Sequence, residues 1–220
     1  MLYIDAGTTY SKIISTGEKL DFEPIKVDGG KFYYIIPSSK ARMSGLNFEK
    51  SCGHMHNDGN AENEIIALAQ GAKKYVEPNS IILDLGSRDA KWIRFKNGKF
   101  KDMDWNTSCA SSTGATVEML LKFYNIKPVD LKFNSEKYNV TCGIFGFEKI
   151  MDDISKGLPP STAIEKFIHG IAFNAWNFAK RPEKLYLSGG FCNNDCFVRS
   201  VEQYCKVIKL GRFILAEGLL

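Results

Sequence analysis

The sequence has 220 residues, of which 44% are hydrophobic and 25% are charged. This balance is ordinary for a globular protein, and the length allows one large core or two smaller ones without disulfide or metal staples. The formal net charge is only +4 and no block of lysines and arginines occurs, which argues against a nucleic-acid partner. There is no signal-peptide pattern and no run of about 18 apolar residues, so we expect no membrane partner and a cytoplasmic location.

The first elements in chain order are two short strands, 2–6 and 10–15, which the turn-forming residues GTT join into a β-hairpin. The stretch 17–60 contains apolar fragments without a helical period, and its secondary structure cannot be assigned from the pattern. Residues 61–75 predict a helix, because they are good helix formers with apolar side chains at helical spacing, and Pro78 prevents continuation.

The remainder of the chain has the pattern of an α/β domain whose sites lie on loops at strand ends. The expected strands are 80–86, 90–96, 99–105 and 184–190, and the expected helices are 113–125, 146–156, 161–180 and 194–204.

Two segments of the chain are weakly alike. IDAGTTYSK and LDLGSRDAK each read as a strand, an aspartate, a glycine, a polar turn and a second strand. Glycine allows close approach of a phosphate, neighbouring hydroxyl and amide groups can donate hydrogen bonds to it, and a carboxylate can hold Mg²⁺ through water. Either segment alone is also a common hairpin sequence. Both together, followed by LSGG, favour a phosphate clamp.

These segments carry a resemblance to a known superfamily. YIDAGTTYSK resembles the first phosphate motif, LDLGSRD the second phosphate motif and LYLSGGFCNND the adenosine motif of the ATPases that include actin, sugar kinases and heat-shock chaperones. Within that superfamily, EIIALAQGAKKYVEPNSIILDLGSRDAKWI together with CASSTG resembles the activators (component A) of 2-hydroxyacyl-CoA dehydratases and the related benzoyl-CoA reductase subunits.

The resemblance implies an α/β fold of two ribonuclease H-like domains, the first of them abbreviated, with ATP or ADP and Mg²⁺ in a cleft between them. We expect the first domain to span 1–78, with 210–220 returning to it, and the second to span 79–209. Carried over residue by residue, the catalytic aspartates are Asp5, Asp84 and Asp89. The residues implied to bind the nucleotide are Gly7, Thr8, Thr9, Lys12, Gly86, Ser87, Arg88, Gly189, Gly190 and Asn194.

Six cysteines occur in an expected reducing compartment, and they are read as buried hydrophobic side chains, metal ligands or redox groups: Cys52, Cys109, Cys142, Cys192, Cys196 and Cys205. A 4Fe-4S cluster needs four thiolates, and the close spacing with which one chain supplies them is absent. Cys109 and Cys142 each precede an expected helix, however, and a two-fold axis would turn two thiols per chain into four. Helix N-termini stabilise the anionic cluster, and the small residues of CASSTG leave room for it. In the activators, cysteines at matching positions bind one cluster at the homodimer interface, so the resemblance implies these two as ligands.

The activity that the resemblance implies is ATP-dependent one-electron transfer to an acyl-CoA dehydratase or reductase, with ferredoxin or flavodoxin as the electron donor. The chain departs from the family where GSRD replaces the usual GGQD, which places Ser87 and Arg88 near the γ-phosphate and leaves water positioning in question. This departure suggests one alternative, a nucleotide-binding scaffold without turnover. A second alternative is a small-molecule kinase of the same superfamily, which would have no use for Cys109 and Cys142.

Other candidate residues have a plainer interpretation. Cys52, His54 and His56 alternate like one face of a strand and lack a fourth zinc ligand. Cys192 and Cys196, which a helix would place on one side, are expected to pack in the core or the nucleotide pocket. Core packing is also expected for Phe167, His169, Phe173 and Trp176.

Overall fold

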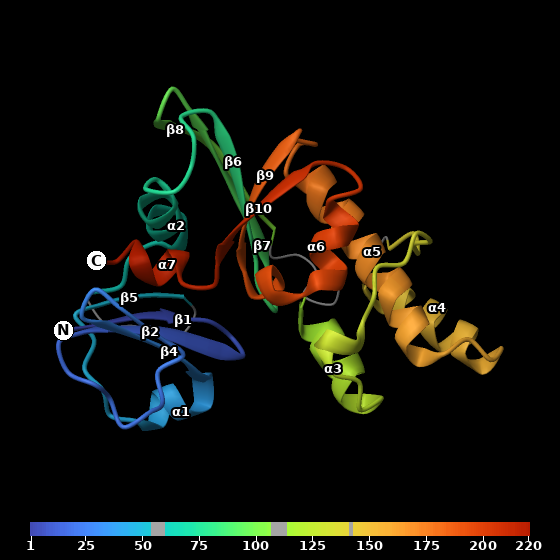
Figure 1. Cartoon of the computed structure of the whole chain (residues 1–220), viewed down its shortest axis with the longest axis horizontal. Helices are drawn as coiled ribbons and strands as arrows, with labels where there is room; N and C mark the ends of the chain where they lie inside the picture. The colour runs from blue at the N-terminus through green and yellow to red at the C-terminus, as the bar shows by residue number, and fades with distance from the viewer. Residues whose placement is uncertain (54–59, 107–113, 141–142) are drawn as a thin grey trace. The chain divides into compact units, whose positions relative to one another are not determined.

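The computed structural model describes residues 1–53, 60–106, 114–140 and 143–220 (Figure 1). The chain divides into two compact units, Met1–Glu77 with Arg212–Leu220, and Pro78–Gly211. Each unit contains a five-stranded sheet accompanied by helices, which confirms the predicted α/β class. None of the helices in the described part of the chain is long and apolar enough to cross a membrane.

The first unit is a sheet with the strand order β3-β4-β2-β1-β5. The predicted opening hairpin is confirmed, and only β5 runs parallel to its neighbour β1. The strands are β1 (Leu2–Ala6), β2 (Tyr10–Thr16), β3 (Lys26–Asp28), β4 (Lys31–Pro37) and β5 (Lys50–Gly53). The helices are α1 (Ser38–Met43), α2 (Glu64–Ala72) and α7 (Ile214–Glu217).

The core of this unit explains its local structure. Ile4, Ile13 and Tyr34 come from three adjacent strands and are completely buried together, so the alternation of apolar residues fixes one face of the hairpin. The predicted helix 61–75 is present as the shorter α2, because the side chain of Asn63 accepts a hydrogen bond of 2.8 Å from the amide of Ile65 and caps the helix there.

The second unit has the strand order β10-β9-β6-β7-β8, with β9 parallel to both β6 and β10. Its strands are β6 (Ser80–Leu85), β7 (Ala90–Lys96), β8 (Lys99–Asn106), β9 (Lys184–Gly189) and β10 (Lys206–Gly211). Its helices are α3 (Gly114–Phe123), α4 (Gly143–Ser155), α5 (Pro160–Phe178) and α6 (Asp195–Val201), and the described residues also form the 3-10 turns η2 (Pro128–Asp130) and η3 (Gly190–Asn193). All predicted elements of this region are confirmed, although α6 ends before 204 and β10 was not predicted.

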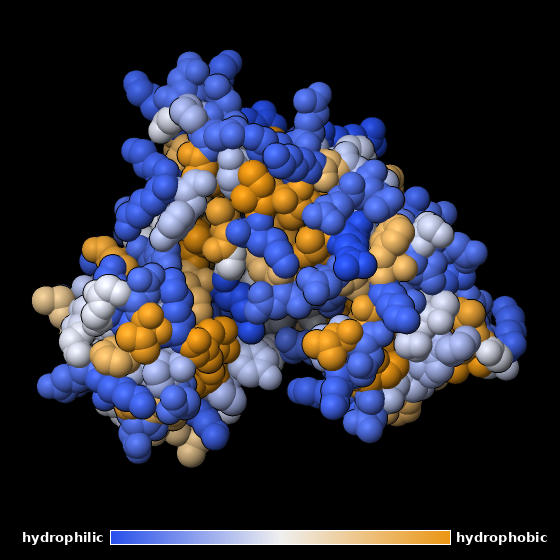
Figure 2. Space-filling view, in the orientation of Figure 1, coloured by the Kyte–Doolittle hydropathy of each residue, from blue (hydrophilic) through white to orange (hydrophobic). Residues whose placement is uncertain are grey.

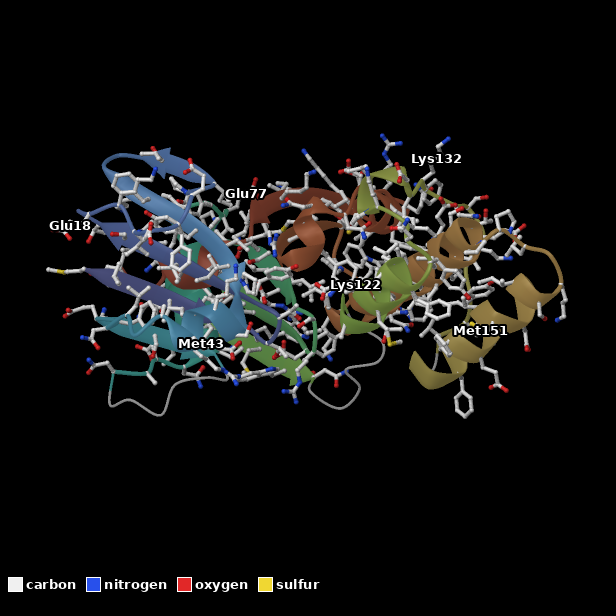
Figure 3. All side chains as sticks on the ribbon, turned by 90° about the horizontal axis from the view of Figure 1, so that it is seen from below. Glu18, Met43, Glu77, Lys122, Lys132 and Met151 are labelled. Carbon is white, nitrogen blue, oxygen red and sulfur yellow. The ribbon has the colours of Figure 1, made fainter. Side chains whose placement is uncertain are left out.

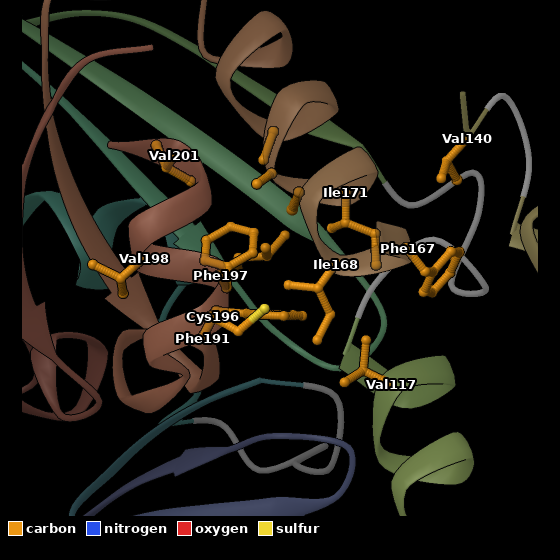
Figure 4. Packing of buried hydrophobic residues seen from close by; sticks show 14 of the residues in the cluster. Val117, Val140, Phe167, Ile168, Ile171, Phe191, Cys196, Phe197, Val198 and Val201 are labelled. Carbon is orange, nitrogen blue, oxygen red and sulfur yellow. The ribbon is translucent and has the colours of Figure 1, made fainter. Parts of the chain in front are cut away.

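The core of the second unit is formed around α5. Phe167 and Ile168 on this helix and Phe197 on α6 are fully buried (Figure 4). Cys192 and Cys196 belong to the same core, which confirms their predicted packing. The two do not share a helix, because Cys192 lies in η3 and Cys196 in α6.

The surface of this unit is not uniformly polar. Figure 2 shows one face of the chain, on which polar residues predominate and apolar residues appear between them in groups. Helices α3 and α4 carry exposed apolar side chains, of which Phe123 is 74% exposed and Phe145 is 59% exposed. The Tyr124 hydroxyl lies 3.3 Å from Sδ of Met151, which joins the end of α3 to α4; Met151 is labelled in Figure 3.

Candidate functional site

The first aspartate turn connects β1 to β2. Asp5 is buried and lies directly opposite Lys12 in the antiparallel ladder, and Oδ2 of Asp5 is 2.9 Å from Nζ of Lys12. This pairing of opposite charges across two strands compensates a carboxylate that would otherwise be buried alone. The turn residues Gly7 and Thr9 are half-buried, and Thr8 is exposed.

Ser38 at the start of α1 fixes the same turn. Its hydroxyl lies 2.6 Å from the carbonyl oxygen of Gly7, and its amide donates a hydrogen bond of 3.0 Å to the carbonyl oxygen of Thr9. The shape of this turn therefore depends on Ser38, which lies in the stretch 17–60, where the sequence pattern predicted no helix or strand.

The second aspartate turn connects β6 to β7 and has the same arrangement with an additional carboxylate. Lys91 lies opposite Asp84 in the ladder, and its Nζ is 3.9 Å from Oδ1 of Asp84 and 3.3 Å from Oδ2 of Asp89. Nε1 of Trp105 on β8 donates a hydrogen bond of 2.7 Å to Oδ2 of Asp89. Two carboxylates, one ammonium group and one indole thus form a buried polar cluster.

The next residues of the second turn are more accessible: Ser87 is half-buried and Arg88 is exposed. Backbone atoms of this turn also bind the start of α3. The amide of Gly114 donates to the carbonyl oxygen of Gly86 at 3.2 Å, and the amide of Ala115 donates to the carbonyl oxygen of Ser87 at 2.9 Å. These bonds use two of the N-terminal amides that a helix cannot satisfy internally, so the helix start and the turn are directly connected.

In both units, a third strand lies next to the strand that carries the aspartate, so the similarity seen in the sequence continues in the sheets. Cys52 on β5 lies beside Asp5, and Ser188 on β9 lies beside Asp84, each in parallel register. The following residues, Gly53 and Gly189, have φ of +102° and +90°. Only glycine adopts such angles readily, which explains why both strands end in this residue type.

Gly189 begins the predicted adenosine turn, which continues through η3 to Asn194. The side chain of Asn194 accepts a hydrogen bond of 2.9 Å from the amide of Phe197 and so caps α6. In the described structure this side chain has a structural role. Its contact with a nucleotide stays a prediction.

The sheet of the second unit brings the second aspartate turn and the adenosine turn together. Asp84 is paired with Ser188 and Leu85 with Gly189, so the two motifs end on adjacent strands. The hydroxyl of Ser188 is fully buried and has no hydrogen-bond partner among the described residues. Together with the carboxylates of Asp84 and Asp89 it supplies oxygen atoms of the kind that Mg²⁺ prefers, so these residues fit a hydrated magnesium ion.

Sequence reasoning missed four residues of this arrangement: Ser38, Lys91, Trp105 and Ser188. For Lys91 a signal existed, because lysine occupies the ninth position of both IDAGTTYSK and LDLGSRDAK. The positions of the other three depend on pairing between segments that are distant in sequence.

The predicted cluster ligands, Cys109 and Cys142, lie outside the described residues, as do His54 and His56. Within the described ranges no group of three or more histidine, cysteine or acidic side chains is placed to hold a metal ion. Desolvation raises the pKa of the Cys196 thiol to about 12 and that of Cys205 to about 11, so both are protonated and behave as core side chains.

His169 is a core residue, as predicted. Its Nδ1 lies 2.8 Å from the carbonyl oxygen of Asn134, and its Nε2 lies 2.8 Å from the hydroxyl of Tyr204. Burial lowers the pKa of His169, although its backbone partners oppose this shift. The ring connects α5 to the chain segment between α3 and α4. Its centroid lies 5.8 Å from that of Tyr204 in a tilted arrangement, and Tyr204 stacks on Trp176 with centroids 5.1 Å apart.

Comparison with known proteins adds an independent finding. The activating ATPase of (R)-2-hydroxyglutaryl-CoA dehydratase from Acidaminococcus fermentans is 23% identical over 217 residues, which cover 88% of this chain and 83% of the relative. The activator of lactoyl-CoA dehydratase from Anaerotignum propionicum is 26% identical over 148 residues, which cover 63% of this chain and 57% of the relative. This chain is similar to activators of 2-hydroxyacyl-CoA dehydratases. The resemblance that the motifs predicted is confirmed.

The fold gives the same result. The solved structure of the activator of 2-hydroxyisocaproyl-CoA dehydratase from Clostridium difficile with bound ADPNP has a TM-score of 0.74 and 19% identity, and the match covers 99% of this chain and 91% of that chain. The chain therefore shares the fold of this structure over 99% of its length. A scan against models of protein families finds no match.

Proposed function

We propose that this protein is an ATP-dependent one-electron-transfer activator of a 2-hydroxyacyl-CoA dehydratase-like or acyl-CoA reductase-like enzyme, with a 4Fe-4S cluster shared across a homodimer. The observation that carries the proposal is the direct backbone connection between the second aspartate turn and α3, the helix that follows Cys109 in the chain. The proposed nucleotide site and the predicted cluster loop would then both adjoin the start of α3.

The nucleotide part of the proposal rests on the two aspartate turns and the adenosine turn. Asp84 would hold Mg²⁺ through water, and the ion would neutralise charge on the phosphates of ATP. Asp5 with Lys12 would serve the first phosphate turn, and Gly189 and Gly190 would lie against the adenosine end. That a structure of a relative carries ADPNP supports a nucleotide as the ligand.

The coupling part rests on geometry within the second unit. The amides of Gly114 and Ala115 bond to the carbonyl groups of Gly86 and Ser87, so a shift of this turn changes the position of the start of α3. A small displacement of the turn would be transmitted to the helix, because packed elements move as rigid bodies. Occupation of the turn by ATP or ADP would then alter the surroundings of the loop that contains Cys109.

The dimer part is supported by the surface of α3 and α4. These are the helices that follow Cys109 and Cys142, and both expose large apolar side chains, among them Phe123 and Phe145. Exposed apolar residues on neighbouring helices are typical of interaction surfaces. Cys109 and Cys142 of each chain would supply the four thiolates that hold the cluster, which would provide one-electron transfer between ferredoxin or flavodoxin and the partner enzyme.

The proposal is tested by anaerobic reconstitution of the wild-type protein and the single variants Cys109→Ser and Cys142→Ser, followed by iron and sulfide analysis and light scattering. We expect about four irons per dimer in the wild type. Each single variant should lose the cluster, since symmetry removes two ligands at once, while Cys196→Ser retains it and ATP binding persists in all of them.

Three outcomes would contradict the proposal. Full iron loading of Cys109→Ser would show that this loop does not bind the cluster. A colourless protein that phosphorylates a small molecule would indicate the kinase alternative. A colourless protein that binds ATP without turnover would indicate a nucleotide-binding scaffold.

A further inference from the structure

One row of side chains crosses four strands of the second sheet. Ser188 on β9 pairs with Asp84 on β6, Asp84 pairs with Lys91 on β7, and Lys91 pairs with Trp105 on β8. Residues that are directly opposite in a ladder point to the same face of the sheet. The four side chains therefore form a continuous row, and Asp89, from the turn between β6 and β7, adds a second carboxylate to it through its contact with Lys91.

The ammonium group of Lys91 is almost completely removed from solvent. Its side chain is 3% exposed, and Nζ lies 3.3 Å from Asp89, 3.9 Å from Asp84 and 5.1 Å from the ring centroid of Trp105. A lysine is rarely buried unless acidic groups compensate its charge. The sequence places the same residue type opposite Asp5, where Lys12 forms an ion pair of 2.9 Å. Each aspartate turn thus contains its own cation.

The row also contains an unused polar group. The hydroxyl of Ser188 lies at the ladder position next to Asp84, is fully buried, and lacks a hydrogen-bond partner within the described structure. A buried hydroxyl without a partner is costly, which indicates that another group completes its hydrogen bonding. A water molecule in the hydration shell of a divalent cation held by Asp84 would do so.

We propose that Lys91 reserves the cation position of the second aspartate turn: while no nucleotide is bound, its ammonium group neutralises Asp84 and Asp89, so that a divalent cation enters only together with the phosphates of a nucleotide. The inference rests on the proposed nucleotide-binding function and concerns the regulation of that same site. Lys91 is a positioning residue here. With two carboxylates and one ammonium group, the row carries a net charge of −1, which is a poor match for a free divalent cation; the phosphates of a nucleotide supply the additional negative charge.

The decisive measurement is a titration with Mn²⁺ alone, in the absence of nucleotide and of turnover. Binding is monitored as the loss of the free-ion signal in electron paramagnetic resonance. Lys91→Met changes the charge of the row from −1 to −2. It is expected to bind Mn²⁺ at least about tenfold more tightly than the wild type, because the ammonium group beside the two carboxylates no longer repels the ion. Lys91→Arg should restore the weak binding of the wild type, since it restores the charge.

The matched control is Lys166→Met. Lys166 belongs to the same unit and also contacts two carboxylates, with Nζ 2.8 Å from Glu136 and 3.8 Å from Asp153, but it lies outside the row. Its replacement should leave Mn²⁺ binding unchanged. A merely structural role of Lys91 predicts a loss of stability and no gain of affinity. A folded Lys91→Met protein with wild-type affinity for Mn²⁺ would overturn the proposal.

Lys91→Gln provides a second neutral variant with a polar end, for the case that Lys91→Met does not fold. The wild type itself gives a test without substitution: Mn²⁺ should bind weakly alone and tightly with a non-hydrolysable ATP analogue. Equal affinity in both titrations contradicts the proposal. If Mn²⁺ binds normally with the analogue but the Lys91 variants show no gain in affinity for Mn²⁺ alone, this inference is refuted and the proposed function is not. Absence of any nucleotide binding refutes the proposed function instead.

Discussion

The adjacent glycines of LSGGF offer a sharp test, because the structure assigns them different roles. Gly189 has φ of +90° and ψ of −168°, a combination that residues with a side chain rarely adopt. A Cβ atom placed on it would lie 2.5 Å from the carbonyl oxygen of Leu85 and 3.0 Å from the backbone nitrogen of the same residue. A Cβ atom on Gly190 would have no heavy atom within 4 Å.

Gly189→Ala should therefore destabilise the protein. A strained backbone of this kind costs about 1–3 kcal/mol, and a collision with the backbone of β6 can be relieved only by separating β9 from β6. We expect a total loss of about 2–4 kcal/mol in the free energy of unfolding. For a protein of this size the melting temperature should fall by roughly 5–15 °C. Gly190→Ala should change the stability by less than about 0.5 kcal/mol.

The assay combines denaturant unfolding with titration of ATP. If Gly190 lies against the adenosine end of the nucleotide, Gly190→Ala weakens ATP binding while leaving the unfolding curve unchanged. Gly189→Ala shifts the unfolding curve itself. Equal stability of the two variants would refute the reasoning from backbone conformation, and unchanged ATP affinity of Gly190→Ala would place the nucleotide elsewhere.

Three further predictions concern the aspartate turn and two buried groups. Asp84→Ala should abolish hydrolysis of Mg-ATP while the circular dichroism spectrum is retained; wild-type turnover would exclude its proposed role. Because the pKa of His169 is lowered below its ordinary value of 6.5, the unfolded state binds a proton first as pH falls. The free energy of unfolding should therefore decrease below about pH 6.5, and His169→Gln should reduce this decrease in unfolding experiments at several pH values. Cys196, whose pKa is raised to about 12, should resist alkylation in the folded protein and react after denaturation, which mass spectrometry of the labelled peptides will show; rapid labelling of the native protein would contradict its burial.

The sequence by itself determined the local features of this protein. The hairpins β1–β2 and β6–β7 with their aspartate–glycine turns, and helices α3, α4, α5 and α6, follow from periodicity and turn chemistry, because their contacts join residues close in the chain. The motifs also indicated the resemblance to dehydratase activators, which the comparisons confirm. The pattern did not reveal β3, β4, α1, β5, α7 and β10. The elements β3, β5 and α7 have only three or four residues, and no residue of β10 is fully buried, so no strong apolar alternation marks this strand.

Only the tertiary structure decided how the motifs of the second unit come together. Parallel pairing of β9 with β6 places Ser188 beside Asp84, and no local rule sets this register, because a long segment with three helices separates the strands. The same holds for the bonds between Gly114 and the carbonyl group of Gly86, which connect a helix start to a turn. Burial then decided the electrostatics: Lys91 reads as an ordinary strand lysine in the sequence, and the sheet encloses its ammonium group beside the carboxylates of Asp84 and Asp89.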